Sequence, residues 1–290
     1  MTLGFILNIM IGGLLTGLVY GLAALGLSVV WGVVRVVNLA HGGIMVAGMY
    51  AAALPVAARG ADPLLALPVV AAGLFVAGFV LQRFLIGRIA ATPESVRLLV
   101  MAGVALLVMN GLLLAFGPGG RGAPAAGAGD ALAFGPFLVD RLQVRAALVA
   151  LMVTVLLFLF FNLTGTGKAI RACADSPFGA RVIGLDLDHL CAVTFGLGAA
   201  VTGVAGCLLA QTVEVRPTLA IDYTIIGFLV VLVGGPGSVG GALLAGMLVG
   251  MVEAVSGALF GPESRELAGC GLLVLILLLW PRGLSGEAEP

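Results

Sequence analysis

The sequence predicts an all-α integral membrane protein, a polytopic bundle of about eight or nine transmembrane helices. Of its 290 residues, 61% are hydrophobic and 10% are charged, whereas a soluble domain carries about 25% charged residues. Several apolar runs exceed the ~18 residues that suggest a spanning helix, and they are not the short alternating segments of a transmembrane barrel. We therefore expect a single transmembrane domain over residues 1–290.

The first span is expected over Gly4–Trp31. It carries Gly13, Gly17 and Gly21 at four-residue spacing, a ridge of small residues that lets a neighbouring helix approach closely. We interpret this ridge as a helix-packing surface.

A polar interruption follows at Asn38, His41 and Gly42, before an apolar run that continues to Ala58. Broken helices at membrane depth are tolerated where they line a cavity or are buried in protein. Asn38 and His41 are three residues apart, so on a helix they would share a face. The alternative is that His41 is a structural residue in a plain turn between two spans.

The remaining spans follow in order, with one short segment among them. Tyr223–Val233 is too short to span unless it includes flanking residues, and it ends in the glycine-rich turn Gly234–Gly241. Residues 117–143, rich in Gly, Ala and Pro, form the longest non-spanning segment, with little to fix their structure. The other expected spans are Pro63–Phe84, Leu98–Phe116, Val144–Leu163, His189–Gln211, Ala242–Phe260 and Gly269–Trp280.

A polar segment at about residues 164–188 separates two apolar runs. A charge in hydrocarbon costs several kcal/mol, so this segment lies outside the bilayer. Ala169–Ala174 favours a short helix, Ser176–Pro177 breaks it, and Ala180, Val182 and Ile183 give a second short apolar face. Gly184 then allows a turn that a bulkier residue would resist. Two such helices form a surface that another protein can bind; the alternative is a solvated loop.

The basic residues give a weak orientation signal. Placing residues 164–188 inside makes residues 117–143 a long extracytoplasmic loop, the N-terminus external and the C-terminus internal. The internal basic residues would be Arg35, Arg83, Arg88, Arg97, Lys168, Arg171, Arg181 and Arg282, and the external ones Arg59, Arg121, Arg141, Arg145, Arg216 and Arg265.

Two motifs resemble catalytic or nucleotide-binding sites but depart from them. Around Gly167–Lys168 a P-loop would need Gly where Asn162 stands and Ser or Thr where Ala169 stands. Around Ser238 a nucleophile elbow would need Gly where Pro236 stands. The four cysteines are scattered without a CxxC pair and are interpreted as small buried residues, not as metal ligands. The zero net charge gives no indication of nucleic-acid binding.

Several stretches, in the right order along the chain, resemble the permease subunits of branched-chain amino-acid ABC importers. The short N-terminus resembles the H-type (LivH-type) subunit more than the longer M-type. The opening of that family is matched by Gly17–Ser28 and Val37–Gly42, its cytoplasmic loop by Arg171–Asp175 and Gly184–Asp186, and its C-terminal region by Gly234–Gly241 and Pro281–Leu284.

The resemblance implies a transport complex in a bacterial plasma (inner) membrane. Its other parts would be a second permease of the M type, two ABC ATPase subunits and an extracytoplasmic substrate-binding protein. It implies no cofactor and no ATP site on this chain, which would not be an enzyme by itself. The solute would be a branched-chain or related small amino acid, although similar permeases carry urea, amides or other small solutes. A secondary transporter is a further alternative, but only Glu253 and His41 could couple an ion gradient.

Roles for individual residues come from the interrupted span and from the resemblance. Because interrupted spans often mark the translocation route in transporters, Asn38, His41 and Gly42 are expected to lie against that path or to support it. Ser176–Pro177 departs from the family loop and puts the geometry of its first helix in question. The residues expected to couple to the ATPase are Arg171, Ala172, Asp175, Ala180, Arg181, Gly184, Leu185 and Asp186.

Overall fold

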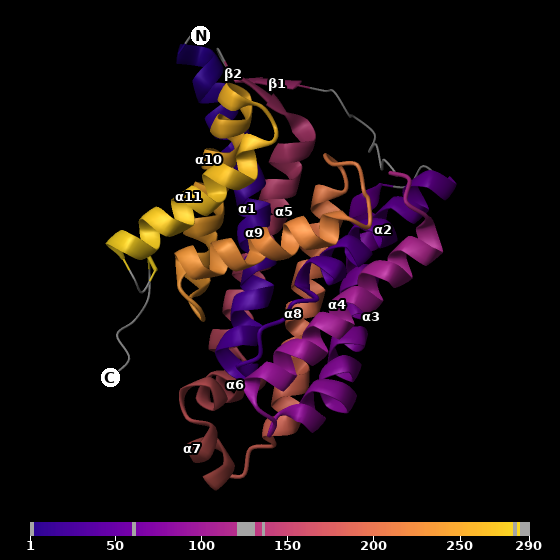
Figure 1. Cartoon of the computed structure of the whole chain (residues 1–290), viewed down its shortest axis with the longest axis vertical. Helices are drawn as coiled ribbons and strands as arrows, with labels where there is room; N and C mark the ends of the chain where they lie inside the picture. The colour runs from indigo at the N-terminus through magenta and orange to yellow at the C-terminus, as the bar shows by residue number, and fades with distance from the viewer. Residues whose placement is uncertain (1–2, 60–61, 121–130, 135–136, 281–282, 285–290) are drawn as a thin grey trace.

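The computed structural model of the chain describes residues 3–59, 62–120, 131–134, 137–280 and 283–284 (Figure 1). The described chain is predominantly helical. Its α-helices are α1 (Leu3–Val34), α2 (His41–Arg59), α3 (Leu67–Leu81), α4 (Glu94–Phe116), α5 (Arg141–Leu163), α6 (Gly165–Asp175), α7 (Pro177–Val182), α8 (Leu187–Leu209), α9 (Leu219–Gly234), α10 (Val239–Phe260) and α11 (Ser264–Leu279). Short helical turns η1 (Pro63–Ala66), η2 (Gln82–Ile86) and η3 (Gly87–Ile89) flank α3.

Six of the described helical segments are long and apolar enough to cross a membrane, which makes this a multi-pass membrane protein. The apolar helices α2 and α9 are shorter, and α11 has 16 residues. The expected eight or nine crossings therefore remain a prediction. The six long segments are Gly4–Val34, Pro63–Ile89, Glu94–Phe116, Arg141–Leu163, Leu187–Leu209 and Val239–Phe260.

Two long helices, α1 and α8, form the centre of the bundle. They pack on each other. Helix α10 packs against α1, and α3 packs against α8. The crossing of α1 and α8 is reciprocal: a Cβ on Gly26 would lie 2.5 Å from the Gly198 carbonyl oxygen, and one on Gly198 would lie 2.6 Å from that of Gly26. Only glycine at both positions lets the two backbones approach this closely.

The predicted glycine ridge of α1 packs against α10, where Gly246 and Gly250 form a second small-residue face. A Cβ on Gly17 would lie 2.4 Å from the Gly246 carbonyl oxygen, and one on Gly250 would lie 2.4 Å from that of Gly13. Lipid tails are as apolar as leucine, so close van der Waals packing of this kind holds membrane helices together. The prediction that the ridge is a packing surface is confirmed.

The two ends of the bundle carry different polar structures. Figure 1 shows α6 and α7 at one end and the N-terminus with the hairpin β1 (Ala131–Phe134) and β2 (Phe137–Asp140) at the other. We refer to these as the α7 end and the hairpin end.

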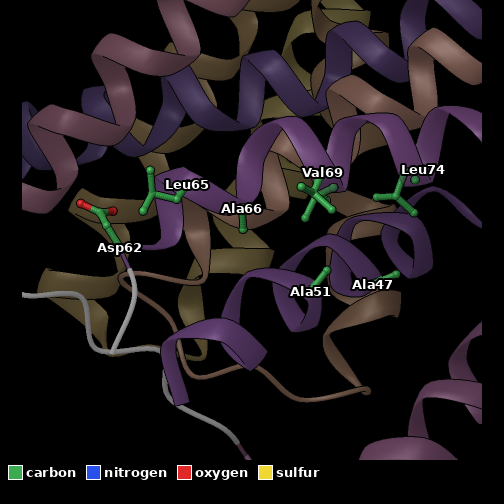
Figure 2. Close-up of a pocket in the computed structure, with 9 residues that line it drawn as sticks. Ala47, Ala51, Asp62, Leu65, Ala66, Val69 and Leu74 are labelled. Atoms are coloured by element: carbon green, nitrogen blue, oxygen red, sulfur yellow. The ribbon is translucent and has the colours of Figure 1, made fainter. Parts of the chain in front are cut away.

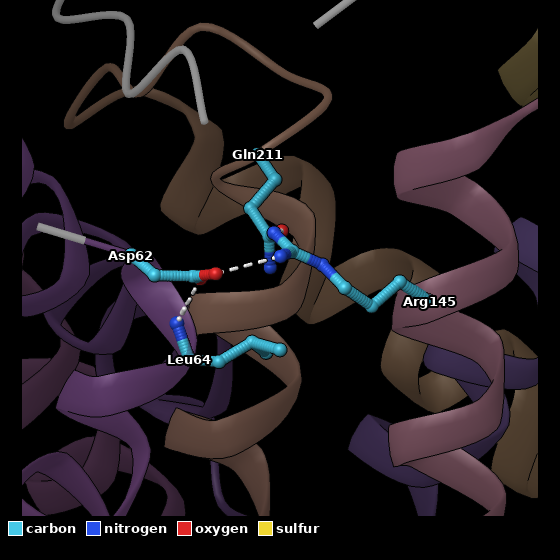
Figure 3. A network of polar contacts seen from close by, with 4 residues as sticks. All are labelled: Asp62, Leu64, Arg145 and Gln211. Atoms are coloured by element: carbon cyan, nitrogen blue, oxygen red, sulfur yellow. Dashed lines mark hydrogen bonds and ion pairs between the residues drawn. The ribbon is translucent and has the colours of Figure 1, made fainter. Parts of the chain in front are cut away.

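At the hairpin end, an ion pair joins segments that are far apart in the sequence. The Arg145 guanidinium on α5 contacts the Asp62 carboxylate at 2.7 Å and donates to the Gln211 side-chain oxygen at 2.6 Å (Figure 3). The start of η1, the start of α5 and the residues after α8 are thereby held together. At the α7 end, Arg35 donates to the Ala174 carbonyl at 3.3 Å, and Arg97 donates to the Arg35 carbonyl at 3.3 Å.

Three sequence expectations need correction. Within residues 117–143, the last residues are ordered: β1 and β2 pair antiparallel, and the Asp140 side chain caps α5 by accepting from the Leu142 amide at 2.8 Å. Asn38 does not share a helical face with His41, because α2 begins only at His41. Cys270 is exposed and Cys191 only partly buried, because α8 and α11 turn these positions outward.

We predict that Gly17→Ala destabilises the protein whereas Gly103→Ala does not. The added methyl group at residue 17 would clash with the α10 backbone, while the space around Gly103 on α4 is open. Overpacking costs about 1–3 kcal/mol, so the melting temperature of the detergent-solubilised Gly17→Ala variant should fall by several degrees. A melting temperature equal to that of the Gly103→Ala control would contradict the role of the ridge.

Candidate functional site

The polar segment between α5 and α8 folds into two short helices, because its residues cap helices and permit tight turns. Thr164 ends α5 and caps α6, its hydroxyl accepting from the Gly167 amide at 3.0 Å. A Cβ on Gly167 would lie 2.3 Å from the Phe160 carbonyl oxygen, so glycine lets α6 pack against the end of α5. The Gly165–Lys168 stretch that resembles a P-loop is thus the first turn of α6.

Helix α6 is amphipathic and is held by its apolar face. Gly167, Ile170 and Cys173 are buried, three residues apart. Burial raises the pKa of the Cys173 thiol, which is consistent with a packing role. On the opposite face Arg171 is exposed and donates to the Asn162 side-chain oxygen at 3.0 Å. The charged face of α6 is therefore available at the α7 end of the molecule.

Ser176–Pro177 separates α6 from α7 without distorting either helix. Ser176 is the C-terminal cap of α6 and the N-terminal cap of α7, its hydroxyl accepting from the Gly179 amide at 3.1 Å. Pro177 occupies the first turn of α7, where the amide hydrogen it lacks has no partner within the helix. The departure from the family loop leaves α6 intact.

The end of α7 is fixed by a Schellman turn. Gly184 has a φ of +84°, the Leu185 amide donates to the Ala180 carbonyl at 3.0 Å, and the Gly184 amide donates to the Arg181 carbonyl at 3.0 Å. Asp186 then caps α8 by accepting from the His189 amide at 3.0 Å. The prediction that Gly184 allows a turn is confirmed.

One side of α7 exposes large apolar side chains. Phe178 is 80% exposed, Val182 70% and Ile183 72%. Ala180 is buried against the bundle, so the expectation that it shares a face with Val182 and Ile183 is wrong, because α7 turns it in the opposite direction. We call Phe178, Val182 and Ile183 the α7 apolar face. It lies outside the apolar spans, at one end of the molecule (Figure 1).

The structure brings all the predicted coupling residues into one compact segment but gives them different surroundings. Ala172 and Leu185 are partly buried, and Ala180 is buried. Phe178 was not among the predicted residues, although a lone aromatic side chain directly after Ser-Pro in a polar segment was the signal for it. The exposed members are Arg171, Asp175, Arg181, Gly184 and Asp186.

The predicted path residues Asn38, His41 and Gly42 are buried where the starts of α2 and α9 meet. The Asn38 side-chain oxygen accepts from the Ala40 amide at 3.1 Å, and the Gly42 amide donates to the Thr224 hydroxyl on α9 at 3.0 Å. A Cβ on Gly42 would lie 2.0 Å from the Ala220 carbonyl oxygen, so only glycine fits. His41 Nδ1 lies 3.4 Å from the Thr202 hydroxyl, and its Nε2 has no partner among the described residues.

Two cavities adjoin these segments. One of about 190 Å³ lies beside the start of α2 and is lined by Leu39, Gly43 and Thr224 among others. A larger one of about 520 Å³ lies at the α7 end, between Ser28 on α1 and Arg171 on α6. The glycine-rich turn Gly234–Gly241 borders it through Gly237, whose amide donates to the Ser28 hydroxyl at 2.8 Å. The turn at residues 235–238 thus lies across this cavity from α6.

A third cavity, of about 400 Å³, is an apolar groove between α2 and α3. Figure 2 shows Leu65, Ala66, Val69 and Leu74 along one side, Ala47 and Ala51 along the other, and Asp62 at one end. Leu65 and Val69 are more than 70% exposed, so the groove lies on the outer surface of the bundle. Its long walls are apolar, and the Asp62 carboxylate at its end is paired with Arg145.

Ser238, which stands in the stretch that resembles a nucleophile elbow, has a structural role. Its hydroxyl accepts from the Gly241 amide at 3.0 Å and caps α10. The positive φ of Gly235 (92°) and Gly237 (82°) forms the turn that leads into this cap. The geometry is that of a helix start.

Comparisons with known proteins agree with this architecture. The chain is similar to the high-affinity branched-chain amino acid transport system permease proteins BraD of Pseudomonas aeruginosa (29% identity, 97% of this chain and 95% of the relative) and LivH of Escherichia coli strain K12 (31% identity, 98% and 97%). A probable LivM permease of Methanocaldococcus jannaschii is 28% identical over 49% of this chain and 46% of its own length.

Among solved structures, a chain of PsaBC from Streptococcus pneumoniae in complex with Fab has the same fold. The TM-score is 0.55 with 14% identity, covering 95% of this chain and 93% of that one. Residues 9–279 match the family described as the branched-chain amino acid transport system / permease component. The chain belongs to that family.

Proposed function

We propose that this chain is the permease subunit of an ABC importer that takes up branched-chain amino acids across the bacterial plasma membrane. It forms the translocation path together with a paralogous second permease, receives its solute from an extracytoplasmic binding protein and is driven by two ATPase subunits. The observation that carries the proposal is that the α6–α7 segment, a pair of capped short helices at one end of a membrane bundle, exposes an apolar face outside the spans.

The α7 apolar face is suited to docking on another protein. Phe178, Val182 and Ile183 lie in a segment too polar for hydrocarbon, so in an isolated chain they would be exposed to water. Exposed apolar side chains grouped on one surface are typical of interaction sites. Arg171, Arg181 and Asp186 surround them and can fix the register of a docked ATPase.

The rigid mounting of this segment explains how docking could move the spans. Capping groups at Thr164, Ser176 and Asp186 define both short helices and the start of α8. Arg35 ties the end of α1 to α6 through the Ala174 carbonyl. A displacement of α7 by a closing ATPase therefore reaches α8 through the Gly184 turn and α1 through Arg35.

The solute class follows from the relatives. Both BraD and LivH are described as parts of high-affinity branched-chain amino acid transport systems, and each aligns over nearly the whole chain. Urea, amides and a secondary-transport mechanism are less favoured, since the names of these relatives point to amino-acid transport systems. The α7 end lies in the cytoplasm on this proposal, as the basic residues Arg35, Arg97, Lys168, Arg171 and Arg181 of that end favour.

Uptake of leucine by cells that carry the complete system should depend on the ATPase and not on the proton gradient. Replacing the catalytic glutamate of the ATPase should abolish uptake, and a protonophore applied with ATP held constant should leave it unchanged. Uptake that persists without ATP hydrolysis but collapses with the proton gradient would instead indicate a secondary carrier.

Phe178→Ala should weaken the association of the ATPase with the permease. Burying a phenylalanine side chain contributes about 1.5–3 kcal/mol, which corresponds to roughly a 10- to 150-fold change in affinity. Co-purification of the ATPase and leucine uptake should both fall. The matched control is Phe260→Ala on α10, which is equally exposed (79%, against 80% for Phe178) but does not belong to the α7 segment. Equal effects of the two substitutions would show that α7 does not take part in ATPase docking.

The three path residues give a separate prediction. In a variant without the four native cysteines, Asn38→Cys should be protected from a small thiol reagent in the conformation described here, where Asn38 is 3% exposed. It should become reactive when ATP binding changes the conformation, while Ser176→Cys should stay reactive throughout because Ser176 is exposed. Full transport by Asn38→Cys without labelling in any nucleotide state would indicate that the break between α1 and α2 serves helix packing and does not line the path.

A further inference from the structure

A polar cleft runs between α1 and α10 at the hairpin end of the bundle, and the proposed function gives it no role. Its volume is about 330 Å³. Helix α1 lines it with Ile9, Gly12, Thr16 and Tyr20, whose spacing of three and four residues places them on one face of the helix. Ile9 and Tyr20 are eleven residues apart, roughly 16 Å along the helix axis. The cleft therefore extends well into the membrane-spanning part of α1.

A buried carboxylate lies in this cleft. Glu253 on α10 is 7% exposed, within a segment apolar enough to cross a membrane. The Tyr20 hydroxyl interacts with its carboxylate. An ionisable side chain within a span is costly and almost always faces a polar cavity or a partner. Glu253 is therefore not explained by contact with lipid.

The cleft also contains a cation that does not neutralise this carboxylate directly. Arg265, in the first turn of α11, lines the cleft and interacts electrostatically with Glu253. The two side chains form no ion pair within 4 Å, although both lie in the described part of the chain. Gly257 has a reason to be glycine here, because a Cβ at that position would meet the Arg265 side chain at 2.4 Å. Gln143 on α5 adds an amide to the same lining.

The remaining walls are small and apolar. Ala254 and Ala258 on α10 and Ile9 on α1 line the cleft together with the glycines of the α1–α10 contact. The lining thus presents a negative group, a separate positive group and a short apolar surface. Small-molecule sites occupy about 300–1,000 Å³, so this cleft has room for a compact solute and not for a large one.

We propose that this cleft is a binding site for an α-amino acid in its zwitterionic form. The solute's ammonium group contacts the Glu253 carboxylate and the Tyr20 hydroxyl, and its carboxylate contacts the Arg265 guanidinium and the Gln143 amide. The aliphatic side chain lies along Ile9, Ala254 and Ala258. This inference rests on the proposed function for the identity of the solute, and it adds a site on the permease itself.

Protection of a cysteine in the cleft tests the site without measuring transport. Thr16→Cys, placed in the assembled complex in a background without the four native cysteines, should react with a small thiol reagent added from the hairpin side. Saturating L-leucine should slow this reaction at least threefold. The 2-oxo acid of leucine, which lacks the ammonium group, and leucinamide, which lacks the carboxylate, should not slow it.

The ligand series separates the possible outcomes on a chain with an intact Glu253. Equal protection by leucinamide and by sodium or potassium chloride would identify a simple cation site and overturn the zwitterion assignment. No reaction of Thr16→Cys with the reagent, or no protection by leucine, would also overturn the proposed site. The Tyr20–Glu253 contact would then be structural.

Glu253→Gln then tests the assigned residue. In the Thr16→Cys background it should raise the leucine concentration needed for half protection at least tenfold. The matched control Glu263→Gln changes an exposed carboxylate at the start of α11 that does not line the cleft, and it should leave that concentration unchanged. An unchanged concentration in Glu253→Gln would exclude Glu253 from the site. In the chain with intact Glu253, absence of protection by leucine together with intact ATP-driven uptake would overturn only the cleft site, whereas ATP-independent uptake would overturn the proposed function.

Discussion

The close approach of α1 to its neighbours is the contact on which the rest of the structure depends. In lipid, apolar helices gain little from burying apolar surface against each other, so their association relies on close packing of side chains and backbones. Gly13 and Gly17 face Gly250 and Gly246 across the α1–α10 contact, and Gly26 faces Gly198 across the α1–α8 crossing. These glycines place α1 at the centre, and the positions of α8 and α10 follow from it.

Helix α1 consequently borders cavities at both ends of the molecule. Ile9 to Tyr20 lines the polar cleft at the hairpin end, and Ser28 lines the cavity of about 520 Å³ beside α6. Residues 21–28 between them are buried. In this conformation the two cavities along α1 are thus separated by packed helix, in which Gly21 lies against the α10 backbone and Gly26 against the α8 backbone.

Five polar side chains of the described residues fix the starts of α-helices. Asp140, Thr164, Ser176, Asp186 and Ser238 each cap a helix by accepting from a backbone amide. The stretches that resembled a P-loop and a nucleophile elbow lie at two of these capped helix starts, those of α6 and α10. Glu253 is different: it lies inside a span and caps nothing, which is why it marks a separate site.

The sequence by itself determined the membrane class, the long spans and the separate polar segment, because each follows from local composition. An 18-residue apolar run, a Ser-Pro break and a glycine at a positive-φ turn need no knowledge of distant residues, and residues 164–188 were located on that basis. The family resemblance was likewise carried by short local motifs such as Val37–Gly42.

Only the tertiary structure decided which surfaces meet. Spacing showed that Gly13, Gly17 and Gly21 form a ridge, but not that Gly246 and Gly250 of α10 face it, because a small-residue ridge fits many partners equally well. The direction of each side chain on the six-residue α7 depended on which side of this helix packs against the bundle, so Ala180 was placed on the wrong face and Phe178 was missed. The cleft around Glu253 could not be predicted either, since its lining comes from α1, α5, α10 and α11, four helices that only packing brings together.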